Sequence, residues 1–228
     1  ALPAANNSAV PFSPGPEHDA LLIYTSGTTG RPKGVIHSHA SLLAGGANTA
    51  AAHHLTPEDR GLCVLPLCHI NGQVVTVMGP LLSGSSVVMP SRFRVSRFWD
   101  WVSVHRCTWF SAVPTIISYL LGAQEAGSDP EKNVLAHVRF GRSASAALPP
   151  AVHTAFVERF GIPLVETMGI TETAAPILSN PLNPKAHRIG SPGKSCGNEV
   201  RIADERSMDL ESGSEGEIQI RGHNVMKG

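Results

Sequence analysis

The sequence has few charged residues and no excess of either sign. Of its 228 residues, 18 are lysine or arginine and 18 are aspartate or glutamate, a charged fraction of 16%. A typical soluble domain has about 25%. Proteins that bind nucleic acids through the phosphates need a surplus of positive charge to displace counterions. The zero net charge therefore argues against a nucleic-acid-binding protein.

Long apolar runs and paired cysteines are also missing. The longest apolar stretch, around residues 74–82, is far shorter than the roughly 20 residues that span a bilayer. Four cysteines in a chain of this length, with no CxxC pair, do not make a disulfide framework. A metal cluster of Cys68 and His69 with His53 and His54 is disfavoured, because the surrounding residues are typical of buried strands and helices. These features favour a reducing, cytoplasmic setting.

The two ends of the chain carry little information about the fold. Residues 1–16 are rich in Pro, Ala, Asn and Ser without periodicity, so we expect 1–18 to be a linker or a mobile end. The N-terminus lacks the layout of a signal peptide and does not begin with methionine. The sequence stops soon after a strand-like run. We therefore expect both ends to be cut.

What the sequence does contain is enough apolar residues, 42%, to bury a core, arranged as short runs that alternate with longer amphipathic ones. The expected strands are 20–24, 61–67, 85–89, 108–113, 138–142, 164–168, 199–203 and 215–221. The expected helices are 38–53, 72–82, 96–105, 114–121 and 150–160. Ser38 is expected to cap the first helix.

This alternation predicts an α/β fold with largely parallel sheets, right-handed crossovers and flanking helices. A polar break at 127–133 is expected to separate a first α/β sub-domain, 19–126, from a second, 134–228. In parallel sheets, ligands bind beyond the carboxyl ends of the strands. We expect the loop at 25–34, after the first buried strand, to lie at such an end.

That loop, with the sequence TSGTTGRPKG, is the most informative stretch. Its three glycines let the backbone approach an anion closely. Its four hydroxyl side chains can donate to phosphate oxygens, and Lys33 adds a mobile positive charge. The segment therefore predicts a cradle for a polyphosphate.

Two common phosphate-binding loops are excluded. Lys33 is followed by Gly34, and not by the Ser or Thr that binds Mg²⁺ in a Walker A loop. The glycines at 27, 30 and 34 do not fit the G-x-G-x-x-G pattern of dinucleotide-binding folds. A flexible surface turn is the plain alternative, because glycine-rich turns are common.

The string TSGTTGRPKG resembles the signature loop of the adenylate-forming superfamily, which includes acyl-CoA synthetases, peptide-synthetase adenylation domains and firefly-type luciferases. Later segments resemble further motifs in the family's order: 65–69 the approach to the acyl pocket, 143–148 the small-residue turn beside the adenine, 166–172 the YGxTE motif, and 216–222 the GE strand. The resemblance covers residues 19–228. It implies a partial N-terminal domain of an acyl-CoA synthetase-like fold.

The resemblance also implies a reaction. A carboxylate attacks the α-phosphorus of ATP to give acyl-AMP and pyrophosphate, and a thiol, CoA in the synthetases, then displaces AMP. The β- and γ-phosphates would be bound by Thr25, Ser26, Gly27, Thr28, Thr29, Gly30 and Lys33. The nucleotide would also contact Ser143, Ala144, Ser145, Glu166, Thr167 and Met168. Thr171 would donate to the α-phosphate and Glu172 would bind Mg²⁺, so these two and Lys33 would be the catalytic residues.

Both motifs have a simpler interpretation from the residues alone. A Thr-Glu pair is typical of a helix N-terminus, and the small residues at 143–147 are typical of tight packing where a helix begins.

The acyl group would be bound by His69, Asn71, Gly72 and Gln73, at the position where the family has its acyl pocket. A histidine in an apolar run is otherwise a hydrogen-bonded core residue. Arg142 is a candidate for meeting an acidic acyl tail, with a surface ion pair as the simpler alternative. Oxalate is disfavoured, because oxalate-specific members carry a histidine directly after the Thr-Glu pair and this sequence has Thr173. A medium-chain, aryl or other small acid remains open.

The sequence departs from the family pattern at Met168, where members usually have a tyrosine that stacks on adenine. A thioether keeps apolar contact but loses the ring face, so weaker nucleotide binding is expected. The aspartate that holds the ribose and the small C-terminal domain with its lysine have no counterpart in the 228 residues. We therefore expect a fragment that binds Mg·ATP weakly and does not turn over.

Three functions follow as hypotheses. The first is an acyl-CoA synthetase of fatty-acid or other acyl metabolism, using ATP, Mg²⁺, CoA and a small carboxylic acid. The second is a domain that loads a carboxylic acid onto a carrier-protein thiol. An amino-acid substrate is disfavoured, because 65–74 lacks an aspartate for the ammonium group. The third is a non-catalytic nucleotide-binding relic. The oligomeric state is not predicted.

Overall fold

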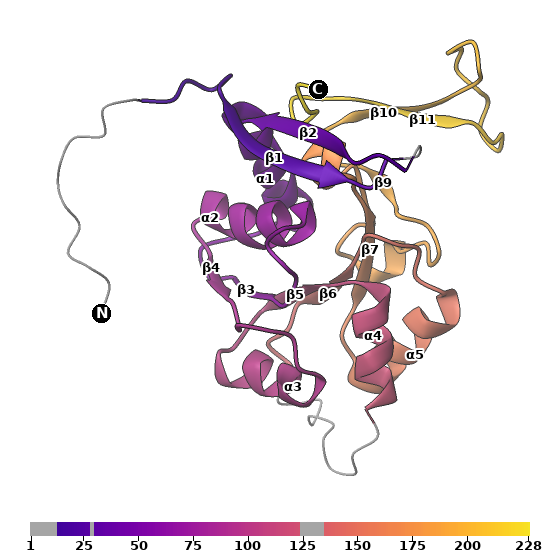
Figure 1. Cartoon of the computed structure of the whole chain (residues 1–228). Coiled ribbons are helices and arrows are strands. Elements are labelled where there is room, and N and C mark those ends of the chain that lie inside the picture. Colours follow the sequence, from indigo (N-terminus) through magenta and orange to yellow (C-terminus); the bar gives the residue numbers. More distant parts are fainter. Residues whose placement is uncertain (1–12, 28–29, 124–134) are drawn as a thin grey trace.

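The computed structural model describes residues 13–27, 30–123 and 135–228, and its largest sheet has seven strands (Figure 1). Their order is β4 (Ser86–Val88), β3 (Arg60–Cys63), β5 (Trp109–Ala112), β6 (Phe140–Ser143), β7 (Leu164–Met168), β8 (Leu178–Ser179) and β9 (Lys194–Ser195). The first five strands run parallel, whereas β8 and β9 are antiparallel to their neighbours. The predicted α/β fold with a largely parallel sheet is confirmed.

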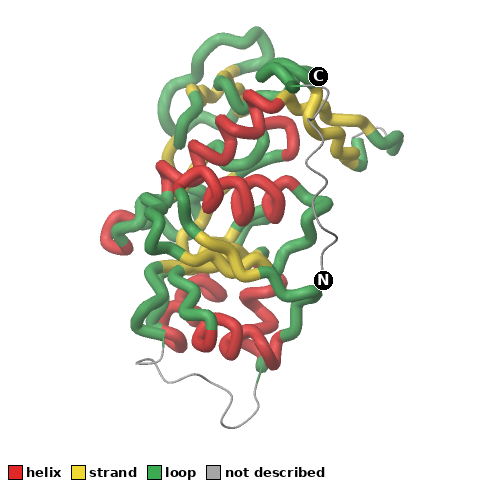
Figure 2. Tube along the Cα trace, turned by 90° about the vertical axis from the view of Figure 1, so that its left-hand side faces the viewer, coloured by secondary structure: helices red, strands yellow, loops and turns green. Residues whose placement is uncertain are grey.

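Helices cover both faces of this sheet, above and below the strands in Figure 2. One face packs against α3 (Val95–Val104), α4 (Pro114–Gly122) and α5 (Pro150–Phe160). The other lies under α1 (His39–Ala52), the π-helix η1 (Asn71–Met78) and α2 (Gly79–Ser83). All four residues of β5 are buried, as expected for a strand covered on both faces.

The predicted positions of most elements agree with the structure. Helix 150–160 and strands 164–168 and 199–203 have the predicted bounds. Ser38 caps α1, since its hydroxyl oxygen accepts a hydrogen bond from the Ser41 amide at 3.1 Å. The predicted helix at 72–82 is instead divided into η1, which ends at Met78, and α2, whose second residue is Pro80. Proline lacks the amide that would continue the first helix.

The strand predicted at residues 20–24 is present, but its predicted place as a buried strand of the parallel sheet was wrong. β1 (Asp19–Thr25) does not belong to the parallel sheet and has no buried residue. It pairs antiparallel with β2 (Lys33–Ser38), a strand that the sequence analysis did not predict. The two strands therefore form a hairpin that is a separate two-stranded sheet.

The expected break between two sub-domains, 127–133, lies outside the described residues. The strands on its two sides, β5 and β6, pair in parallel. One apolar core also crosses the break, since Phe110 packs with Phe156. The described residues on the two sides of the break therefore share the seven-stranded sheet and one apolar core.

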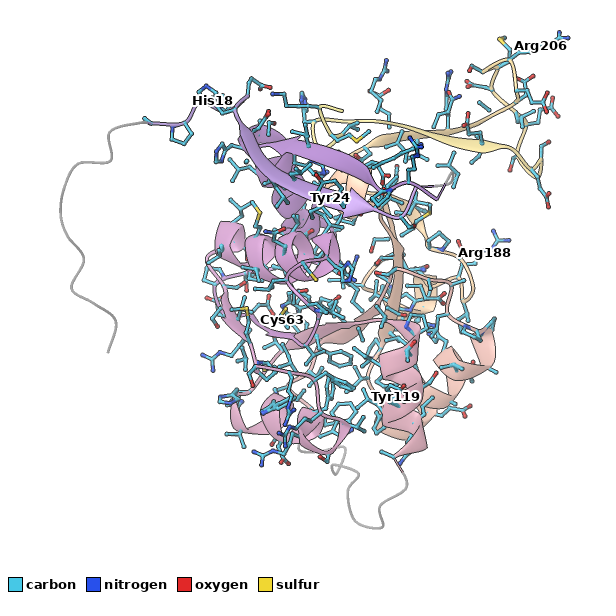
Figure 3. All side chains as sticks on the ribbon, in the orientation of Figure 1. His18, Tyr24, Cys63, Tyr119, Arg188 and Arg206 are labelled. Atoms are coloured by element: carbon cyan, nitrogen blue, oxygen red, sulfur yellow. The ribbon has the colours of Figure 1, made fainter. Side chains whose placement is uncertain are left out.

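A third sheet is formed by β10 (Glu199–Ala203) and β11 (Glu217–Arg221), which pair antiparallel and project to one side of the molecule. Figure 3 shows Arg206 at the tip of this ribbon and Cys63 in the interior of the main layer. Within the described residues, no helix is long and apolar enough to cross a membrane.

A polar cluster holds the amino-terminal edge of the main sheet. Asp59, Thr108 and Arg139 directly precede β3, β5 and β6. The Asp59 carboxylate accepts hydrogen bonds from Thr108 Oγ1 at 2.6 Å and from Arg139 Nη1 at 2.5 Å. Burial alone would raise the pKa of Asp59, but the hydrogen bonds from Thr108 and Arg139 outweigh it and hold the pKa below its ordinary value.

We expect Asp59→Ala to lower the free energy of unfolding by about 1–3 kcal/mol, because the Thr108 hydroxyl and the half-exposed Arg139 guanidinium lose the buried carboxylate that accepts from them. Urea titration of the full-length gene product measures this. Asp100→Ala is the matched control, since its ion pair with Arg97 is 58% exposed and is worth about 0.5 kcal/mol. Because the folded pKa is lowered, the Asp59 contribution is present above about pH 4 and is lost as the pH falls through the folded pKa. Equal losses in the two variants would contradict the assignment.

Candidate functional site

Two adjoining pockets open at the carboxyl ends of the five parallel strands. The small pocket has a volume of about 320 Å³ and lies beyond β6 and β7. The large pocket has a volume of about 900 Å³ and is lined by residues that follow β3, β4, β5, β6 and β7. Ser145, Gly169 and Ile170 line both. The cavities therefore lie where ligands bind in parallel sheets, but the loop at 25–34, which was expected at this edge, follows a strand of another sheet.

The small pocket brings together two of the predicted nucleotide-binding segments. It is lined by Ser143, Ser145, Ala146, Ala147, Leu148, Glu166, Thr167, Met168, Gly169, Ile170, Gly190 and Pro192. Ala144, predicted with them, is buried and does not line the pocket. Ser143 Oγ is buried without a hydrogen-bond partner among the described residues. An unpartnered buried hydroxyl beside an apolar pocket fits a polar ligand that supplies the missing partner.

Glu166 forms the wall of the small pocket and does not present a free carboxylate. Its Oε1 accepts hydrogen bonds from His153 Nδ1 at 2.9 Å and from the Gly190 amide at 3.0 Å. Gly190 and Pro192 were missed by the sequence analysis. In the sequence, a glycine directly before a Ser-Pro-Gly run was the available signal for a turn. The structure confirms a turn-like backbone there, with Gly190 at φ +82°, but nothing in the sequence placed it beside β7.

The loop after β7 contains the predicted Thr171–Glu172 pair and lines the large pocket. The two residues begin a short 3₁₀ helix, Thr171–Thr173, and both are half-buried. The Glu172 carboxylate has no hydrogen-bond or ion-pair partner among the described residues. Nor does any group of three or more His, Cys, Asp or Glu in that part of the chain form a metal site. Glu172 is therefore a single, available carboxylate in the wall of the large pocket, two residues after Ile170, which lines both pockets.

Three donors from distant parts of the chain hold this loop. His37 Nε2 donates to the Thr171 carbonyl at 2.7 Å, the Met226 amide to the Glu172 carbonyl at 2.8 Å, and Asn224 Nδ2 to the Thr173 carbonyl at 2.6 Å. The next residue, Ala174, has φ +46° and presses on α1, where a Cβ at Gly45 would lie 2.3 Å from the Ala174 carbonyl oxygen.

Strand β2 connects the glycine-rich loop to this site. His37, near the end of β2, contacts Thr171, whereas Lys33 begins the strand. The four residue steps from Lys33 to His37 span about 13 Å in an extended strand, so Lys33 lies about that far along β2 from the contact with Thr171. Gly27 has φ +63°, and a Cβ there would lie 2.3 Å from the Arg31 carbonyl oxygen, so the turn needs glycine.

The other residues predicted for this loop have different positions. Thr25 is half-buried, and Ser26, Gly30 and Lys33 are exposed. Thr28 and Thr29 lie outside the described residues. None of the described loop residues lines either pocket.

Two of the four predicted acyl-binding residues line the large pocket, the exposed His69 and the buried Asn71. Gly72 is instead packed against the chain, since a Cβ there would lie 2.6 Å from the Pro66 carbonyl oxygen. Gln73 is half-buried and does not line the pocket either. Arg92, exposed after β4, lines the pocket and was missed; the strand prediction at 85–89 was the signal that pointed to the residues following it.

Arg142 was expected either to meet the acyl tail or to form a surface ion pair, and both expectations were wrong. It is 1% exposed and does not line the pocket. Its Nη1 donates to Asn71 Oδ1 at 2.7 Å and to Ser111 Oγ at 3.1 Å.

The comparisons with known proteins agree on one family. A family model described as AMP-binding enzyme matches residues 2–228. The sulfoacetate–CoA ligase of Cupriavidus necator is 52% identical over 229 residues, which cover all of this chain and 44% of that protein. The oxalate–CoA ligase of Arabidopsis thaliana is 38% identical over 216 residues, 93% of this chain and 41% of that protein. The chain thus spans less than half the length of these relatives.

Solved structures agree. MatB from Rhodopseudomonas palustris, bound to ATP, superposes with a TM-score of 0.84 at 31% identity, over 94% of this chain and 41% of that one. MenE from Bacillus subtilis, in complex with ATP and magnesium ion, gives a TM-score of 0.81 at 30% identity, over 94% and 43% of the two chains.

We expect His37→Leu to loosen the loop after β7, because it leaves the Thr171 carbonyl without its side-chain donor, at a cost of about 1–3 kcal/mol. Amide hydrogen exchange of residues 171–175 should become faster, while exchange in β5 stays unchanged. His39→Leu is the matched control, since His39 is half-buried two residues away and makes no side-chain hydrogen bond within the described residues. Unchanged exchange in the His37 variant would show that the bond does not hold the loop.

Proposed function

The chain belongs to the AMP-binding enzyme family, and on this basis we propose that it binds ATP and a small carboxylic acid for an AMP-forming acid–CoA ligase of the cytoplasm. The observation that carries the proposal is the pair of adjoining pockets: Gly169 and Ile170 line both, and the next two residues, Thr171 and Glu172, line the large one. A nucleotide in the small pocket and an acid in the large one would meet beside these two residues. Positioning of this kind is the main requirement for transfer to a phosphorus atom.

The small pocket suits the adenine. Its lining is mostly apolar, Met168 supplies a polarisable contact, and the unpartnered Ser143 hydroxyl offers a polar one. The phosphates would then extend towards β2 and the hairpin loop, with Lys33 and the loop amides neutralising their charge. Glu172 fits a magnesium site, because Mg²⁺ is often held by one carboxylate together with phosphate oxygens. The metal would supply charge neutralisation on the phosphates.

The acid would lie in the large pocket with its carboxylate towards Thr171. One carboxylate oxygen attacks the α-phosphorus, the bond to the pyrophosphate oxygen breaks, and the Thr171 hydroxyl donates to an α-phosphate oxygen as charge develops there. In the second half-reaction the sulfur of CoA forms a bond to the acyl carbon and AMP leaves. Arg92, without a side-chain partner among the described residues, adds positive charge to the pocket, and His69 adds an imidazole that can form hydrogen bonds.

The acid itself is suggested by the relatives. Sulfoacetate and oxalate, the substrates named for the two ligases above, are short acids with a second negative group. A short acid of this kind is preferred here over a medium-chain or aryl acid. Transfer to a carrier-protein thiol remains the second candidate, and a panel with free CoA and a pantetheine-loaded carrier protein would separate the two.

We expect Glu172→Gln to lower the rate of ATP–pyrophosphate exchange by roughly 100-fold or more, because the amide lacks the charge that holds the metal. The assay uses the full-length gene product and a panel of carboxylic acids. Glu205→Gln, on the exposed ribbon, is the matched control and should keep wild-type exchange. Wild-type exchange in the Glu172 variant, or none with any acid in the wild type, would refute the proposal.

We expect Met168→Tyr to tighten ATP binding by roughly 2- to 10-fold, since an aromatic stacking contact is worth about 0.5–1.5 kcal/mol. Titration calorimetry with ATP and Mg²⁺ measures the affinity. Met208→Tyr, 64% exposed on the ribbon, is the control and should not change it. Unchanged affinity in the Met168 variant would mean that the small pocket does not hold the adenine.

A further inference from the structure

Arg142 is a buried positive charge without a negative partner among the described residues. It lies on β6, and its side chain is 1% exposed. Burial lowers its pKa to about 10, so the guanidinium stays protonated near neutral pH. No carboxylate in the described part of the chain forms an ion pair with it, and its Nε has no hydrogen-bond partner there. Burying a charge in this way is costly unless something offsets it.

The titratable groups that interact with Arg142 do not offset it. Burial, and next the charge of Arg142, lower the pKa of His53 to about 3, so its ring is neutral. Burial raises the pKa of the Cys196 thiol to about 11, although Arg142 opposes this, so the thiol is neutral as well. A negative charge that compensates Arg142 therefore has to come from elsewhere.

Asn71 connects this charge to the large pocket. Its Oδ1 accepts from Arg142 Nη1 at 2.7 Å and lies 3.3 Å from Ser111 Oγ, which fixes the orientation of the amide. Its Nδ2 then points away from Arg142 and donates to Ser145 Oγ at 3.2 Å. Because Ser145 accepts from Asn71, its own hydroxyl proton is free to donate. Asn71 and Ser145 both line the large pocket.

The wall of the large pocket thus presents the N–H donors of Asn71 and the O–H donor of Ser145. The buried Arg142 guanidinium sets their direction through Asn71. We propose that Arg142, through Asn71 and Ser145, makes the large pocket select short carboxylic acids that carry a second negative group, such as a sulfonate or a carboxylate. This inference rests on the proposed function and deepens it. Arg142 is a positioning residue, because it does not reach the pocket itself.

The test compares acids with one and two negative groups. In the full-length gene product, kcat/KM for ATP–pyrophosphate exchange is measured with sulfoacetate, malonate and propionate. We expect the wild type to prefer the two doubly charged acids. Arg142→Gln, which keeps a hydrogen bond to Asn71 but removes the charge, should lower this preference on the order of tenfold or more, mainly through KM. Arg142→Lys should restore most of it.

Two further variants separate selectivity from stability. Arg142→Met should keep or raise the melting temperature, because replacing an unpaired buried charge by an apolar side chain of similar length is often neutral or stabilising. Arg97→Gln removes one positive charge from the exposed surface of α3 and should leave the preference unchanged. If the Arg142 variants raise KM equally for all three acids, or change the melting temperature alone, Arg142 is structural and the proposal is wrong.

Direct binding keeps the inference independent of turnover. Calorimetric titration of sulfoacetate into protein that holds a non-hydrolysable ATP analogue should show affinity about tenfold weaker in Arg142→Gln than in the wild type. If no acid supports exchange but the affinities still differ in this way, the proposed ligase function fails and the anion selectivity stands. Equal affinities would overturn the selectivity even where exchange is normal.

Discussion

The loop after β7 depends on three consecutive carbonyl oxygens, those of Thr171, Glu172 and Thr173, each held by a donor from another part of the chain. His37 comes from the hairpin, and Asn224 and Met226 follow the β10–β11 ribbon. Both pockets are lined by this segment or the residues just before it, so their shape requires that all three regions are docked. The site is thus a product of long-range hydrogen bonds and not of one local motif.

The parts of the fold that could be predicted are those with a strong local pattern. Helix α5 begins at a proline and ends before a glycine, and β7 begins with two apolar residues and ends before another glycine, so their bounds follow from the sequence. Strand β2 was missed, because its first residues belong to a glycine-rich stretch that resembles a loop and its pairing with β1 is a tertiary fact. The first strand was placed in the wrong sheet for the same reason.

The candidate site divides in a similar way. Ser143, Ser145, Thr167 and Met168 meet in one pocket, as the resemblance implied, because they end neighbouring parallel strands. Gly72 and Gln73 follow Asn71 but turn away from the pocket in the π-helix, which changes the periodicity that the prediction assumed. Arg142 was expected at the surface because arginines usually are; its burial depends on Asn71 and Ser111, which come from η1 and β5.

The close approach of Gly45 to Ala174 has a consequence for engineering. Exchanging a helical glycine for alanine is a usual route to a more heat-resistant protein, worth roughly 1 kcal/mol in an exposed helix. At Gly45 that route is closed, because a methyl group would lie 2.3 Å from the Ala174 carbonyl oxygen. The methyl would displace the segment that joins the two cavities. Stability and an intact binding cleft therefore both require glycine at this position of α1.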